Sequence, residues 1–71
     1  MVEIFKTNVN DRDHAQLLIS EIHGAFNNYK ATFDLEDCDK ILRVKSNAEV
    51  IQPTSLILFL KNFGCAAEVI F

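Results

Sequence analysis

The sequence predicts an α+β fold in which four antiparallel strands form one sheet and two helices cover one of its faces. Three observations lead to this prediction. The chain has 71 residues, the size of one domain, and its 49% hydrophobic residues are enough for a core. The apolar residues repeat with strand and helix periods in the order β-α-β-β-α-β. Gly24 and Gly64 follow the two helical stretches at equivalent places, so the halves share one pattern. We expect a single domain over residues 1–71.

The chain begins with an expected strand and helix. Residues 2–9 alternate between two faces, with Val2 and Ile4 on one face and Phe5 on the other. Asn10 is expected to cap the following helix, which Gly24 ends. The apolar residues of this helix have the i, i+3, i+4, i+7 spacing of one buried stripe and are Ala15, Leu18, Ile19 and Ile22.

The middle of the chain predicts a β-hairpin. Residues 29–35 and 41–45 alternate as strands, and the polar residues 36–39 form the turn between them. The side chains expected to face the core are Ala31, Phe33, Leu35, Leu42 and Val44. The side chains expected to face away are Lys30, Thr32, Asp34, Ile41, Arg43 and Lys45.

The last part predicts a helix and a final strand. Pro53 suits the first helical position, Gly64 follows the helix, and residues 66–71 form the strand. The complete order is the split βαβ pattern of the ferredoxin-like fold. The usual handedness of the crossovers then gives the sheet order 4-1-3-2.

The charges and residue types of the sequence argue against several classes of function. Seven Lys and Arg against ten Asp and Glu give a net charge of −3, which does not favour nucleic-acid binding. Four acids lie between Asp34 and Asp39, as a solvated turn or as a site for a cation or a basic partner. No set of residues typical of catalysis is present, so we do not expect an enzyme. Without an apolar run of membrane-spanning length or a secretory pattern, we expect a cytoplasmic protein.

The predicted topology brings three connections to one edge of the sheet. These are residues 8–14, 36–39 and 64–65. The side chains with metal-binding chemistry that they carry are Asp11, Asp13, His14, Asp37, Cys38, Asp39 and Cys65. The sequence therefore places both cysteines at the same end of the molecule.

The length, the element order and the closing segment 56–70 (LILFLKNFGCAAEVI) resemble the heavy-metal-associated domain family, which includes copper chaperones. The signature of that family is a Met-x-Cys-x-x-Cys loop between the first strand and the first helix. In this sequence the equivalent stretch is 9–14 (VNDRDH). Asp11 and His14 stand where the family has its two thiolates, so the resemblance does not imply copper transfer by the usual route.

Two interpretations of the altered loop are open. In the first, Asp11 and His14 join Cys38 and Cys65 in a weak site for a divalent transition metal such as zinc, nickel or cobalt, which accept harder ligands than Cu(I) does. In the second, metal binding was lost and only the fold was kept.

A third interpretation is a protein-interaction or homodimerisation module without a metal. Leu58 widens the apolar face of the second helix. Phe5, Ile41 and Ile70 are expected on the sheet face away from the helices. The last strand is an edge with a single charge, Glu68, and an edge of this kind invites pairing with another strand. A small-molecule-sensing dimer of the same fold is a further alternative.

Overall fold

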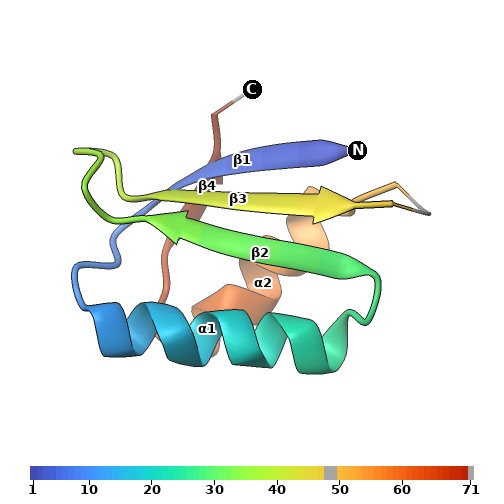
Figure 1. Cartoon of the computed structure of the whole chain (residues 1–71), viewed down its shortest axis with the longest axis horizontal. Coiled ribbons are helices and arrows are strands. Elements are labelled where there is room, and N and C mark those ends of the chain that lie inside the picture. Colours follow the sequence, from blue (N-terminus) through green and yellow to red (C-terminus); the bar gives the residue numbers. More distant parts are fainter. Residues whose placement is uncertain (48–49, 71) are drawn as a thin grey trace.

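The computed structural model describes residues 1–47 and 50–70, which form one four-stranded sheet and two helices (Figure 1). The elements along the chain are β1 (Val2–Thr7), α1 (Arg12–Ala25), β2 (Tyr29–Asp34), β3 (Ile41–Ser46), α2 (Pro53–Lys61) and β4 (Ala67–Val69). This is the predicted element order.

The sheet is antiparallel throughout, with the strand order β2-β3-β1-β4. This is the predicted order read from the other end, and the α+β architecture is confirmed. Both helices lie on the same side of the sheet (Figure 1). On the other side, the outward residues of β2 and β3 that the alternation predicts are exposed, apart from half-buried Ile41.

The ends of α1 differ from the prediction. Asp11, not Asn10, is the N-cap, because its side chain accepts a hydrogen bond from the backbone of Asp13. Gly24 lies inside the last turn, and the helix continues to Ala25 with Phe26 as the C-cap. A Cβ at Gly24 would contact nothing within 4 Å, so nothing around that position forces the helix to stop there.

The ends of the second half are closer to the prediction. Pro53 begins α2, and Gly64 has the positive φ of 77° that favours glycine in the turn after the helix. β4 has only three residues, Ala67–Val69, whereas 66–71 was expected. Phe71 lies outside the described residues.

The core lies between the sheet and the two helices. Its largest fully buried side chains include Phe5, Leu18, Ile22, Leu42, Leu56 and Leu60. The placement of Phe5 on the open face is wrong, because this side chain is 0% exposed and pairs in register with buried Leu42. Each face of β1 carries both apolar and polar residues, so alternation defined the faces without deciding which one meets the helices.

We expect Phe5→Ala to lower the free energy of unfolding by about 3–5 kcal/mol, because it leaves a cavity under both helices. Ile4→Ala, on the other face of the same strand, should cost about 1–2 kcal/mol, since that side chain is only half-buried. Urea denaturation of the two variants measures the difference. If Phe5→Ala does not fold, Phe5→Leu takes its place. Equal losses at positions 4 and 5 would contradict the assignment of faces.

Candidate functional site

The three predicted connections do meet at one edge of the sheet, which we call the loop edge (residues 8–14, 35–40 and 62–66). The backbone N–H of Thr7 donates to the carbonyl of Asp39 over 3.1 Å. The N–H of Ala66 donates to Oδ1 of Asn8 over 2.9 Å. These hydrogen bonds hold the end of β1 against the second connection, and the first connection against the third.

Asp11 and His14, the two residues predicted as ligands from the first connection, have structural roles at this edge. Asp11 caps α1 through the 3.0 Å hydrogen bond to the backbone of Asp13. Nε2 of His14 lies 2.8 Å from the carbonyl oxygen of Phe63. Because a carbonyl only accepts hydrogen bonds, Nε2 must carry the proton and donate. His14 therefore ties α1 to the turn after α2.

The two cysteines have contrasting surroundings. Cys65 is 1% exposed, and burial raises the pKa of its thiol to about 11. Cys38 is exposed on the β2–β3 hairpin. In the described part of the chain, no three of Asp11, His14, Cys38 and Cys65 bring their donor atoms within 4.8 Å of one another. These four residues all lie at the loop edge, but their donor atoms do not converge on one site.

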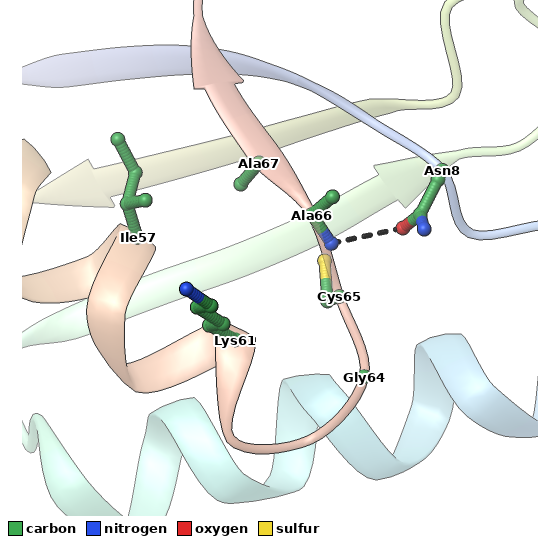
Figure 2. A pocket seen from close by; sticks show the side chains of 7 residues that line it. All are labelled: Asn8, Ile57, Lys61, Gly64, Cys65, Ala66 and Ala67. Carbon is green, nitrogen blue, oxygen red and sulfur yellow. Dashed lines mark hydrogen bonds between the residues drawn. The ribbon is translucent and has the colours of Figure 1, made fainter.

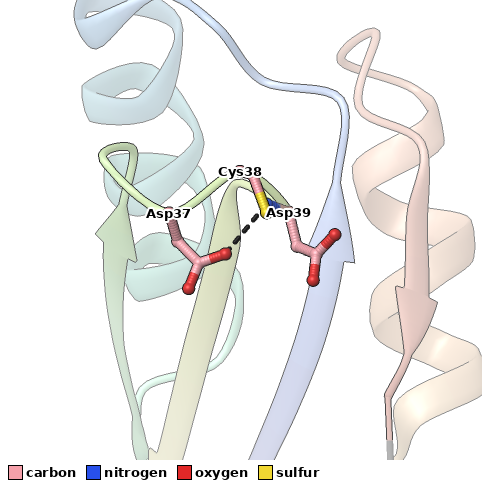
Figure 3. A group of neighbouring side chains, drawn as sticks. All are labelled: Asp37, Cys38 and Asp39. Atoms are coloured by element: carbon pink, nitrogen blue, oxygen red, sulfur yellow. Dashed lines mark hydrogen bonds between the residues drawn. The ribbon is translucent and has the colours of Figure 1, made fainter.

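Cys38 instead lies with its two sequence neighbours. Donor atoms of Asp37, Cys38 and Asp39 all lie within 4.8 Å of one another, and the three residues are exposed (Figure 3). The N–H of Asp39 donates to Oδ1 of Asp37 over 2.8 Å, which shapes the turn. The run of acids around Cys38 was the sequence signal for this group.

A hollow of about 400 Å³ lies beside β4 (Figure 2). We call it the β4 groove; its lining residues are Asn8, Ile57, Lys61, Gly64, Cys65, Ala66 and Ala67. Ile57 and Lys61 come from α2, and Ala66 and Ala67 come from the chain entering β4 (Figure 2). The groove is therefore open along the outer edge of the sheet.

The backbone of β4 is free to accept another strand. Ile70 donates its N–H to the carbonyl of Ile4 on β1 over 3.0 Å. Since antiparallel strands alternate bonded and non-bonded pairs, Glu68 also bonds towards β1, and the backbone groups of Ala67 and Val69 point away from the sheet. No described strand lies on that side, because β4 ends the sheet.

The opposite edge of the sheet, formed by β2, is partly protected. The register of β2 with β3 points the backbone N–H groups of Tyr29, Ala31 and Phe33 outward. The N–H of Tyr29 donates to the carbonyl of Phe26, and that of Ala31 donates to Nε2 of His23 over 3.1 Å. α1 and its C-cap thus occupy two of the three outward donors of β2, those in the first half of the strand. This role of His23 was not predicted, because it depends on how α1 packs beside β2.

Comparisons of the chain with protein-family models, with curated proteins and with solved structures found no match. Neither helix in the described part of the chain combines the length and hydrophobicity needed to span a lipid bilayer.

The raised pKa of Cys65 predicts a loss of stability at alkaline pH. Between the ordinary thiol value of 9.0 and about 11, the folded protein keeps a proton that the unfolded chain has lost. The stability contributed by the neutral thiol is full below about pH 9 and falls as pH rises towards 11, by about 1.4 kcal/mol per pH unit. Urea unfolding at several pH values should show a smaller alkaline loss for Cys65→Ala.

Cys38→Ala is the matched control for this measurement, because it removes an exposed thiol. It should keep the pH dependence of the unchanged protein. Equal alkaline slopes for Cys65→Ala and the unchanged protein would contradict the assignment.

Proposed function

We propose that this domain is a protein-interaction module that forms a homodimer by pairing the free edge of β4 with β4 of a second copy. The observation that carries the proposal is the contrast between the two edges of the sheet. Two of the three outward donors of β2, those of Tyr29 and Ala31, are occupied, whereas neither Ala67 nor Val69 has an acceptor for its N–H among the described residues. Sheet edges with unpaired backbone groups are the usual sites of strand addition.

The side chains of β4 suit pairing with a copy of themselves. An antiparallel pairing centred on Glu68 places Ala67 opposite Val69 of the second copy, and the outward backbone groups of both residues then bond in pairs. Ala67 and Val69 both face the helix side of the sheet, where they pack against the core. The small Ala67 side chain leaves room for valine at the β4 groove, which Ile57 also lines. A strand added here gains main-chain hydrogen bonds and an apolar contact together.

The charges on this edge set the strength of the pairing. The same register brings Glu68 opposite Glu68 of the second copy, and like charges at such positions are destabilising. Lys6 lies opposite Glu68 on the inner side, so each carboxylate has a cation beside it in the same row. The interface has only three residues of strand on each side, and the dimer is therefore expected to be weak and reversible.

We expect Ala67→Pro to abolish dimerisation and leave the fold intact. Proline removes the outward N–H of residue 67 without touching a hydrogen bond to β1, and proline is tolerated at such edge positions. Sedimentation equilibrium over a micromolar to millimolar range should show a monomer–dimer equilibrium for the unchanged chain and a monomer for the variant.

Ala67→Ser is the matched control, because it keeps the N–H and the small side chain, and it should dimerise. Thermal unfolding followed by circular dichroism establishes that both variants fold. A monomer for the unchanged chain at the highest concentration sinks the proposal, and so does an Ala67→Pro variant that folds and still dimerises.

Divalent-metal binding is a second candidate, favoured by the cluster of donors from Asp37, Cys38 and Asp39. Two carboxylates and a thiolate suit Zn²⁺, and their exposure predicts weak binding with water completing the coordination. Calorimetry of the reduced protein with Zn²⁺ should give heat that Cys38→Ser and Asp37→Asn both diminish. His14→Gln, outside the group, should leave that heat unchanged. No heat below millimolar Zn²⁺ excludes this candidate.

A further inference from the structure

The sheet face away from the helices, which we call the open face, has a charge opposite to that of the whole chain. Its residues by register are Val2, Ile4, Lys6, Lys30, Thr32, Asp34, Ile41, Arg43, Lys45, Glu68 and Ile70. Four of the seven Lys and Arg of the chain lie here with two of its ten acids, a local charge of 4 − 2 = +2. The remainder has three cations and eight acids, which gives 3 − 8 = −5.

An aliphatic strip with charged neighbours crosses this face. Ile4 on β1 lies between Arg43 on β3 and Ile70 on β4. In the next row, Ile41 lies between Asp34 on β2 and Lys6 on β1, and Glu68 lies on the far side of Lys6. Ile70 is 38% exposed, and Ile4 and Ile41 are half-buried, so the strip is open to solvent. An apolar centre with a charged rim is the usual composition of a protein-binding surface.

One pair on this face opposes the stability of the fold. Lys30 on β2 and Lys45 on β3 are directly opposite in the register, and both are exposed. Like charges at directly opposite positions destabilise a sheet. Arg43 lies next to them in the following row. Three cations therefore gather at one corner of the face, while its two acids lie in the row that contains Ile41. This corner is a site that an anionic partner would stabilise.

The composition of the face separates the classes of partner. Single-stranded nucleic acid binds sheet faces by stacking on aromatic side chains, and every aromatic residue of the described strands (Phe5, Tyr29 and Phe33) lies on the helix side. A second copy stacked face to face would bring two positive surfaces together. The aliphatic strip, with the cationic corner beside it and a net positive charge on the whole face, fits a polypeptide that has aliphatic side chains flanked by carboxylates.

We propose that the open face binds an acidic amphipathic helix of a partner protein. The aliphatic side of the helix covers Ile4, Ile41 and Ile70, as helices cover the other face of the same sheet. Its carboxylates bind Arg43 and the Lys30–Lys45 pair. This inference goes beyond the proposed dimer and does not depend on it. The side chains of the open face point away from the plane of the sheet, whereas the backbone groups of β4 that would pair in the dimer lie along the edge of the sheet.

The test measures binding of a labelled helical peptide by fluorescence anisotropy. The peptide has about 15 residues, or about four turns, with leucine at i, i+3, i+4 and i+7 and glutamate on the flanks. The unchanged protein should bind it, and more weakly as salt rises. Lys45→Glu should weaken binding about tenfold or more, because one cation is lost and a carboxylate faces the peptide. The same variant should unfold at an equal or higher temperature, since it replaces a like-charge pair with a Lys30–Glu pair.

The controls separate the open face from general charge effects. Lys61→Glu makes the same charge change on α2, away from this face, and should bind the peptide within about twofold of the unchanged protein. Ala67→Pro should bind the peptide as tightly as the unchanged protein does. Because this variant tests the dimer and not the open face, failure of the dimer and failure of this proposal are distinguishable. Equal weakening by Lys61→Glu and Lys45→Glu overturns the proposal.

Two further probes test the class of partner. A peptide with lysine in place of each glutamate should not bind. Vesicles of anionic phospholipid and a single-stranded oligonucleotide should bind less tightly than the acidic peptide. Tighter binding of either one, or equal binding of the lysine peptide, overturns the assignment to an acidic helix.

Discussion

Two helices can cover only one face of a four-stranded sheet, and most features of this molecule depend on that constraint. The covered face holds the buried side chains, with Phe5 and Leu42 opposite each other at its centre. Among the described residues, no element covers the other face and no strand pairs with the outer side of β4. The surfaces open for interaction are those that the two helices leave uncovered.

At the loop edge, three segments of the chain lie close together without forming the predicted metal site. Asp11 and His14 were predicted to be metal ligands, yet both make hydrogen bonds that hold the fold together. Cys65 is buried behind the turn, and Cys38 lies on an exposed hairpin. A metal site needs donor atoms that converge on one point. A connection can lie at the loop edge while its side chains point away from the side chains of the other connections.

The two edges of the sheet also differ for a physical reason. α1 is long enough for His23, in its last turn, to reach the N–H of Ala31, so the first half of β2 is protected. α2 ends at Lys61 and leaves the groove that lies beside the start of β4. The edge at β4 and the open face are separate surfaces. The edge offers main-chain groups, and the open face offers aliphatic side chains beside a cationic corner. A dimer formed through the first surface would keep the second accessible.

The sequence by itself determined the element order, the alternation within each strand and, through the hairpin, the cations on the outward face of β2 and β3. These properties follow from local periodicity and turn position, which neighbouring residues set. Only the tertiary structure decided that Phe5 faces the helices, that His23 protects β2, and that the candidate ligands do not converge. Each of these depends on packing between segments distant in the chain, which a repeating pattern along one strand or helix does not specify.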